Sequence, residues 1–267
     1  MALSPGTAKR RPNPLMRYFV SAADDAIAQQ YTERLRTAGV DVVDEFDSDA
    51  VIVSIGGDGA ILYNARRYER PTILPVAVPG SEGNTIQVTT AEAVDRIETL
   101  ESGTDGEHYH LETHHKLAAY RDGDLVRPGF RAMNDIHLHH TSPVRAAKFA
   151  VRILDRGVVY ETDRAIGDGL LVATPFGSTA YYRALTGGTF DSGVGVAFNN
   201  RHKPADAPDH LVLSSDATVE VRLRERSYGP NAALYRDDDP EPYRLSGGEP
   251  VTIARSDRTV EIVRLIE

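Results

Sequence analysis

Two glycine-rich segments, far apart in the chain, each join an apolar run to small polar residues. The first, Gly56-Gly57-Asp58-Gly59, follows the apolar residues 51–55. The second, Gly167-Asp168-Gly169, leads through apolar residues 170–173 into the sequence TPFGSTAY at 174–181. A phosphate group needs backbone N–H groups directed at it with no side chain in the way, and glycines after a buried strand provide them. The two segments therefore predict a site for phosphates and a nucleotide.

Asp58 is the residue of the first segment that can do chemistry. A helix that follows the turn adds its positive end to the phosphate site. The carboxylate then lies where a hydroxyl group and a metal-bound phosphate can meet. Because phosphoryl transfer depends mainly on positioning and charge neutralisation, a carboxylate need only orient the hydroxyl and accept its proton late. The alternative is a structural turn, since Gly-Gly-Asp-Gly is also good turn chemistry.

The second segment predicts a strand over residues 170–173 that is broken at Pro175. Ser178 or Thr179 can then cap a helix. This brings a helix N-terminus, two hydroxyl groups and the ring of Tyr181 to one point. The alternative is an ordinary strand–turn–helix unit with a capping serine.

The elements around the first segment alternate between strand and helix over the first hundred residues. Strands are predicted at 17–22, 40–43, 51–55 and 72–78, and helices at 24–38, 60–68 and 90–100. Residues 51–55 are apolar apart from one serine, as expected of a strand covered on both faces. The repeated β-α-β order predicts an open, mostly parallel α/β sheet.

The pattern changes near His108 to strands joined by hairpin signals. Strands are predicted at 117–121, 125–126, 148–154, 158–161, 211–213, 219–223, 251–253 and 259–266, with one helix at 178–185 and polar loops at 204–209 and 236–242. We therefore expect an α/β domain over 1–107 and a β-rich domain over 108–249. The tail, about 250–267, can pack back on the first domain.

The composition excludes several classes of protein. The chain has 267 residues, is 41% hydrophobic and carries a net charge of −9, which argues against a general nucleic-acid binder. It has no cysteine, which excludes disulfides and thiolate metal sites. No apolar run approaches the roughly 18 residues of a membrane span. Residues 1–14 carry basic residues without an apolar core, unlike a signal peptide, so we expect a cytoplasmic protein without a membrane partner.

Histidines gather in two stretches of the β-rich half, at positions 108, 110, 114 and 115 and at positions 137, 139 and 140. In a strand, His137 and His139 would share one face, which can suit a metal ion. The simpler interpretation, which we favour, is surface or interface histidines.

Taken together with Asn134-Asp135 between them, the two segments resemble the NAD kinase family, which phosphorylates the 2′-hydroxyl of the adenosine ribose of NAD. The family's hallmarks are a GGDGT turn, an Asn-Glu or Asn-Asp pair, and a GDG…TPTGSTAY…GG stretch. Here they correspond to residues 56–60, 134–135 and 167–181, with Gly187-Gly188 after them. The order and spacing agree, and the resemblance covers residues 17–266. Three ordered motifs are far more specific than the GGDG turn, which lipid kinases and phosphofructokinases share.

The resemblance implies an α/β domain and a β-sandwich-like domain with the site between them. It makes Asp58 the catalytic carboxylate and gives the phosphate turn to Gly56, Gly57 and Gly59. The implied NAD-binding residues are Asn134 and Asp135 at the adenosine, Asp168 at the nicotinamide end, Thr179, Ala180 and Tyr181 in the pocket, and Asn200 in a loop near the substrate. The resemblance also implies Mg²⁺ on the donor phosphates, ATP or polyphosphate as donor, and a homodimer or homotetramer.

The sequence departs from the family pattern at three places. Ala60 stands where the GGDGT turn has threonine, Phe176 replaces a small residue, and in the segment 76–84 only Gly80 and Gly83 remain of the family's pattern. These changes favour an alternative function, a non-catalytic dinucleotide-binding or regulatory homologue. The intact Asp58 and Asn134 favour the enzyme, a phosphotransferase with an alcohol group as acceptor.

Overall fold

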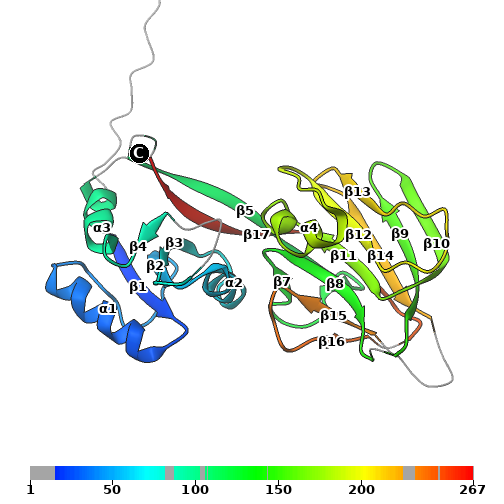
Figure 1. Ribbon diagram of the computed structural model, residues 1–267, viewed down its shortest axis with the longest axis horizontal. Helices are drawn as coiled ribbons and strands as arrows, with labels where there is room; N and C mark the ends of the chain where they lie inside the picture. The colour runs from blue at the N-terminus through cyan, green and yellow to red at the C-terminus, as the bar shows by residue number, and fades with distance from the viewer. Residues whose placement is uncertain are drawn as a thin grey trace, which may run out of the picture.

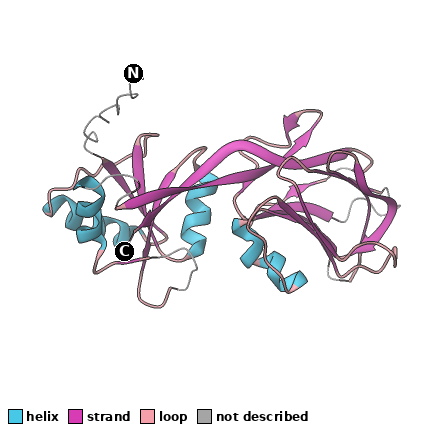
Figure 2. Cartoon of the chain, turned by 90° about the horizontal axis from the view of Figure 1, so that it is seen from above, coloured by secondary structure: helices cyan, strands magenta, loops and turns pink. Residues whose placement is uncertain are grey.

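Two long antiparallel strands connect the two parts of the molecule (Figure 1). The computed structural model describes residues 16–81, 87–102, 106, 108–142, 144–224, 232–245 and 247–266. The connecting strands are β5 (Tyr109–Arg121) and β17 (Pro250–Leu265). Figure 2 shows from above how they run from the helix-bearing part into the β-rich part.

The first part is an α/β unit built on parallel strands. In sheet order these are β1 (Arg17–Ala22), β2 (Ala50–Ile55) and β3 (Thr72–Ala77), with β4 (Val88–Thr89) beside β3. Its helices are α1 (Asp25–Thr37), α2 (Asp58–Arg67) and α3 (Ala93–Ser102). Strand β17 pairs in parallel with the edge of β3 that also binds β4, opposite β2, through Glu261 and Ile262.

Strand β2 is covered on both faces, as its apolar sequence predicts. Val51, Val53 and Ile55 belong to the core that also holds residues of α1 and α3. Ile52 points the other way, into the core beneath α2 with Ile61. Successive side chains of a strand point to opposite faces, so a central strand between two helical layers must be apolar at nearly every position.

The second part is a β-sandwich. One layer is an antiparallel sheet in the order β13 (His210–Leu213), β12 (Val194–Asn199), β11 (Gly169–Ala173), β8 (Asp135–His140), β15 (Ala232–Arg236) and β16 (Tyr243–Arg244). The other layer continues the large sheet from β17 through β14 (Thr218–Leu223) and β9 (Ala147–Leu154) to β10 (Val158–Gly167). Short strands β6 (Asp124–Leu125) and β7 (Arg131–Ala132) pair with β5.

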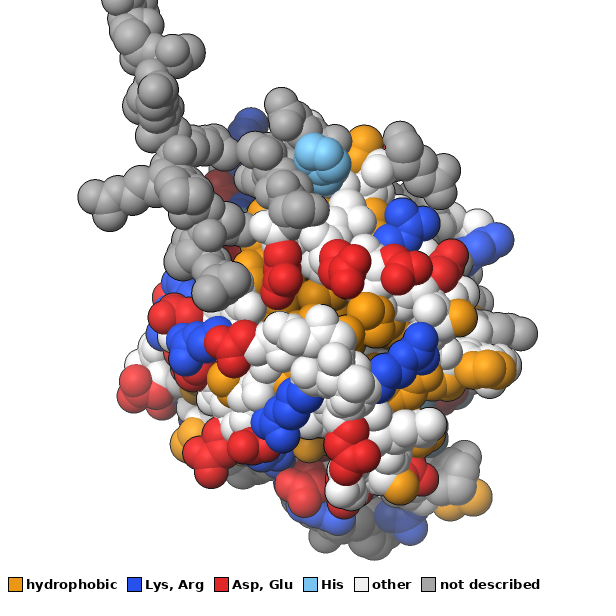
Figure 3. Space-filling model, turned by 90° about the vertical axis from the view of Figure 1, so that its left-hand side faces the viewer, with side chains coloured by type: hydrophobic (Ala, Val, Ile, Leu, Met, Phe, Trp, Pro, Cys, Tyr) orange, Lys and Arg blue, Asp and Glu red, His pale blue; other side chains and the backbone are white. Residues whose placement is uncertain are grey.

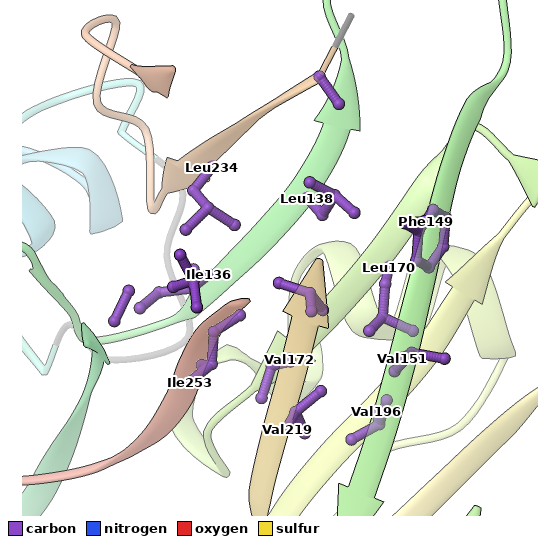
Figure 4. Packing of buried hydrophobic residues seen from close by; sticks show 14 of the residues in the cluster. Ile136, Leu138, Phe149, Val151, Leu170, Val172, Val196, Val219, Leu234 and Ile253 are labelled. Atoms are coloured by element: carbon purple, nitrogen blue, oxygen red, sulfur yellow. The ribbon is translucent and has the colours of Figure 1, made fainter. Parts of the chain in front are cut away.

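The sandwich core lies between these layers (Figure 4). Alternate residues of β8 and β11, such as Ile136 and Val172, meet alternate residues of the opposite layer, such as Val151 and Val219. The predicted fold class, an α/β part plus a β-sandwich-like part, is confirmed. The domain limits at 107 and 249 stay a prediction, because β5 and β17 take part in both units.

Three predicted elements differ in the structure. The predicted strand 40–43 is a single bridge between Val42 and Tyr18, because only the backbone around Val42 reaches β1. The strands predicted at 251–253 and 259–266 are one strand, β17, whose pairing with β5 shifts register between Arg255 and Thr259.

The helix predicted at 178–185 is also divided. A 3₁₀ turn, Phe176–Thr179, precedes α4 (Tyr181–Thr186), with Ala180 between them in a non-helical conformation. Ser178 does not cap α4, because its hydroxyl donates to the carbonyl of Phe190 at 2.9 Å. The basic residues 9–11, the retained Gly83 and the departure at Asn84 lie outside the described residues.

The end face of the α/β part carries acidic and basic side chains interspersed with one another (Figure 3). A nucleic-acid site would need basic groups gathered on one face. Of the helices in the described part of the chain, none combines the length and the apolar character that crossing a membrane requires.

Candidate functional site

A cavity of about 800 Å³ lies where the start of α2 faces the sandwich. Strands β5 and β17 form one wall, and the turns after β11 and before β12 form another. Four of the predicted site residues line it: Asp58, Asn134, Thr179 and Ala180. The cavity thus brings residues of both glycine-rich segments to one place.

The turn before α2 depends on glycine at its first position. Gly56 has a φ of 148°, and a methyl group there would lie 2.9 Å from the Cβ of Ala60. Gly57 is the N-cap residue of α2 and makes no side-chain hydrogen bond to the helix, and Asp58 is the first residue of the helix. Gly59 faces Asp238: a methyl group added at Gly59 would lie 3.6 Å from the Asp238 Oδ2 atom. The three glycines are not among the residues that line the cavity, and their phosphate-binding role stays a prediction.

Asn134 is held by the turn that follows β11. The Thr174 hydroxyl donates to the carbonyl of Met133 at 2.5 Å, and the Thr174 N–H donates to the carbonyl of Asn134 at 2.8 Å. Gly177 packs directly on Asn134, because a methyl group there would lie 2.6 Å from the Asn134 Cα. The Asn134 Oδ1 atom is buried and has no hydrogen-bond partner among the described residues. It is therefore well suited to contact a ligand.

Asp168, Tyr181, Asn200 and Asp135 lie outside the lining of this cavity. The Asn200 side chain donates to Asp168 at 3.1 Å, and the Tyr181 hydroxyl accepts from Asn199 at 2.8 Å. Asp135 contacts His137 at 3.2 Å, and the His137 ring lies edge-on to Tyr181. The predicted NAD-binding residues thus form two groups, one in the cavity and one on the outer face of β8 and β11.

The histidines of β8 belong to this second group. The His137 ring stacks on Tyr235 with 5.2 Å between centroids and is turned edge-on to His139. No set of three or more histidine, cysteine or acidic residues in the described ranges is arranged to hold a metal ion. The metal-site interpretation of His137 and His139 therefore finds no support.

Strands β5 and β17 contribute cavity residues that the sequence analysis did not assign. These are Glu112, His114, His115, Arg255 and Arg264. The Arg264 guanidinium donates to Glu112 at 2.7 Å, and Arg255 bonds the ring of His115. The partners of these β5 residues lie more than a hundred residues away along the chain. Only the antiparallel pairing of β5 with β17 joins them.

The pKa values of the two cavity histidines are lowered, which favours their neutral form. Burial lowers the pKa of His114, although Glu112 opposes the shift. Burial and the Arg255 charge lower the pKa of His115. For Glu112, burial acts to raise the pKa, but the Arg264 hydrogen bond and the His114 ring outweigh it and lower the pKa. The guanidinium groups of Arg255 and Arg264 therefore supply positive charge to this wall. Phe176 packs edge-on to His114, with 4.9 Å between the ring centroids.

The chain matches known proteins over most of its length. Residues 133–265 match the model of the ATP-NAD kinase C-terminal domain. An NAD kinase from Gemmatimonas aurantiaca is 30% identical over 221 residues, which cover 80% of this chain and 72% of that protein. An NAD kinase from Methanosarcina acetivorans is 26% identical over 251 residues, covering 93% and 82% of the two chains.

Two solved structures share the fold. An NAD kinase from Archaeoglobus fulgidus in complex with ATP superposes with a TM-score of 0.69 at 20% identity, over 92% of this chain and 93% of that one. Yeast NADH kinase complexed with NADH superposes with a TM-score of 0.76 at 16% identity, over 96% of this chain and 85% of that one. Both superpositions cover the α/β part and the sandwich.

Proposed function

The chain belongs to the NAD kinase family, and we propose that its cavity is the site where a phosphoryl group is transferred to the 2′-hydroxyl of the adenosine ribose of NAD, giving NADP. It is a phosphotransferase with an alcohol group as acceptor. The observation that carries the proposal is that Asp58 and Asn134 line one cavity together with the turn after β11. Beyond the sequence departures at Ala60, Phe176 and 76–84, nothing in the described structure or among the relatives favours the alternative of a non-catalytic homologue.

On the acceptor side, Asn134, Thr179 and Ala180 bind the adenosine half of NAD. Support comes from the buried Oδ1 atom of Asn134, which lacks a partner in the described part of the chain. A buried polar atom costs free energy unless a hydrogen bond satisfies it, so a ribose hydroxyl or adenine amine would gain from this contact. Asp58, on the same cavity, then orients the 2′-hydroxyl and accepts its proton late in the transfer.

On the donor side, the phosphates of ATP lie against the start of α2. The N-terminus of a helix favours anions, and the guanidinium groups of Arg255 and Arg264 add positive charge across the cavity. Ala60 supplies no hydroxyl here, so the backbone and the arginines carry more of the binding. Polyphosphate, which offers the same phosphate groups, is the second donor to test.

A magnesium ion fits this donor set. The carboxylates lining the cavity are Asp58, Glu112 and Asp191, and Glu112 is already paired with Arg264. Mg²⁺ is commonly held by one or two carboxylates together with substrate phosphates. Asp58 and Asp191 are the residues that would hold it with the donor. When bound, the ion neutralises charge on the phosphates.

We further propose that the working enzyme is a cytoplasmic homodimer or homotetramer. Asp168 is expected at the nicotinamide end of NAD, Tyr181 in its pocket and Asn200 in a loop near the substrate, yet all three lie away from the cavity that Asp58 lines. A second subunit that presents this group to the cavity of the first would complete the site. The mass of the native protein, compared with 29.2 kDa for one chain, tests this proposal.

The decisive experiment measures NADP formation from NAD and Mg²⁺ with ATP or polyphosphate. Asp58→Asn keeps the shape of the side chain but cannot accept the hydroxyl proton. We expect turnover to fall by about 10²- to 10⁴-fold while the affinity for NAD stays nearly unchanged. Near-normal turnover in the variant would remove Asp58 from the catalytic role. Saturable NAD binding without product in the wild type would favour the non-catalytic homologue instead.

A further inference from the structure

We propose that Asp237 is a positioning residue for this reaction, because its carboxylate holds the backbone of residues 133–135 and so keeps the Asn134 side chain in the cavity. The inference rests on the proposed function. The sequence placed Asp237 only in a polar loop. In the structure it follows β15 and lies beside the start of β8.

One carboxylate serves three consecutive backbone donors. Asp237 Oδ2 accepts from the N–H of Met133 at 3.1 Å, and Oδ1 accepts from the N–H of Asn134 at 2.7 Å and of Asp135 at 3.3 Å. The Asp237 N–H returns a bond to the carbonyl of Asp135 at 3.0 Å. Hydrogen bonds to an ionised acceptor are stronger than neutral ones, so at pH 8, where the kinetic test below is made, this contact fixes the segment firmly.

The opposite side of the same segment is held by the turn after β11. Thr174 binds the carbonyls of Met133 and Asn134, and Gly177 packs on the Asn134 Cα. The backbone of Asn134 thus has its N–H on Asp237 and its carbonyl on Thr174. With both backbone groups bound, the side chain has few ways to leave the cavity.

Asp237 keeps a backbone conformation that costs free energy. Its φ is 45°, in the left-handed region that few residues other than glycine adopt. Such conformations persist where the surrounding structure determines them, and they gather at functional sites. The conformation lets three adjacent aspartates point to three different partners.

The neighbouring carboxylates extend the same turn to the helix that carries Asp58. Asp238 pairs with Arg66 of α2. Asp239 pairs with Arg236 at 2.8 Å and with Arg127 at 3.0 Å, which fixes the turn itself. The turn 237–239 therefore contacts both the Asn134 segment and α2. This sets the acceptor-binding residue relative to the catalytic carboxylate.

The test is the steady-state kinetics of Asp237→Asn at pH 8. The amide oxygen can still accept from Asn134 and Asp135, but an NH₂ group then faces the N–H of Met133 and the negative charge is gone, so the clamp on residues 133–135 weakens while the shape is retained. We expect the KM for NAD to rise about tenfold and the KM for ATP to stay within about twofold. Asp24→Ala is the matched control: its carboxylate also accepts two backbone N–H groups, from Ala26 and Ile27, but at the start of α1. That variant should lower the melting temperature without changing either KM.

A double-mutant cycle separates positioning from general stability. In an Asn134→Ala background, Asp237→Asn should no longer change the KM for NAD, because the side chain through which it acts is gone. An unchanged KM in folded Asp237→Asn, or an equal effect in both backgrounds, would overturn the inference. If the amide variant does not fold, Asp237→Glu, which keeps an accepting carboxylate, is measured in both backgrounds by the same criteria. Wild-type protein that forms no NADP refutes the proposed function, whereas active wild type with an unaffected variant refutes only the role of Asp237.

Discussion

Gly177 is the residue on which the closeness of the two site segments depends most directly. An added methyl group would overlap the backbone of Asn134, which neither Thr174 nor Asp237 allows to move. We expect Gly177→Ala to lower the free energy of unfolding by about 3 kcal/mol, the upper end for overpacking, and to raise the KM for NAD. Urea unfolding and steady-state kinetics test this.

The control for that substitution is Gly188→Ala. An added methyl group there has only the Thr186 hydroxyl nearby, at 3.9 Å, and Gly188 is exposed. The free energy of unfolding of this variant should match that of the wild type. Equal stability for both variants would show that the turn Phe176–Thr179 moves more freely than its contacts indicate.

The carboxyl group of Asp237 also predicts a pH dependence of stability. Burial and the neighbouring Asp135 raise the pKa of Asp237 from 3.8 to about 7, although the three backbone N–H groups oppose the shift. Between these two values the folded protein keeps a proton that the unfolded chain has lost. The contribution of this group to the free energy of unfolding therefore falls as the pH rises from about 4 to about 7.

Asp237→Asn should remove that part of the pH dependence, because the amide does not titrate. Urea unfolding of the wild type and the variant between pH 4.5 and 8 measures it. The difference in stability between the two proteins should change with pH up to about 7 and then level off. A constant difference across the range would contradict the raised pKa.

At the scale of elements, α2 is fixed at the end opposite Asp58 by a buried lysine. Lys116 of β5 donates from Nζ to the carbonyls of Ala65 and Tyr68 at 2.6 Å and of Glu69 at 2.9 Å. The last carbonyls of a helix lack partners within it, and the Lys116 side chain supplies donors there, although burial lowers its pKa to about 7. Strand β5 therefore fixes the helix whose first residue lines the cavity.

Lys116→Met keeps the length of the side chain and removes its donors. We expect a loss of about 1–3 kcal/mol in the free energy of unfolding, because buried carbonyls lose their partner. Turnover should fall as well, since α2 carries Asp58. Lys148→Met, at an exposed position of β9, is the control and should change neither quantity. Unfolding that is unaltered by Lys116→Met would mean that water replaces the ammonium group.

The apolar periodicity of the sequence was sufficient to predict most elements of the α/β part, and the motifs led to four of the residues that line the cavity. Residues 51–55 are an example, because a strand between two helical layers must be apolar on both faces. Asp237 and Lys116 could not be predicted in this way. Their partners are backbone groups of distant segments, and only the pairing of β15 with β8 and the packing of β5 on α2 bring them together.

At the scale of the whole molecule, the two parts share strands and not just a linker. Strand β17 pairs with β3 in the α/β part and with β14 in the sandwich, and β5 pairs with it along most of its length. Neither part can unfold alone without breaking these ladders. We expect a single calorimetric transition whose midpoint rises with added NAD. Two resolved transitions, only one of which responds to NAD, would contradict this expectation.

The position of β17 in the large sheet also affects how the protein is made on the ribosome. Strand β3 leaves the ribosome early, but the neighbour that covers one of its edges is supplied by residues 261–262. During synthesis of the entire sandwich, β4 pairs with this edge of β3 at Val76 and Ala77, but Thr72 and Ile73 have no partner strand there. An open strand edge is a template for pairing with other chains. A chaperone would therefore protect this protein most during the period when the α/β part has been made but β17 has not.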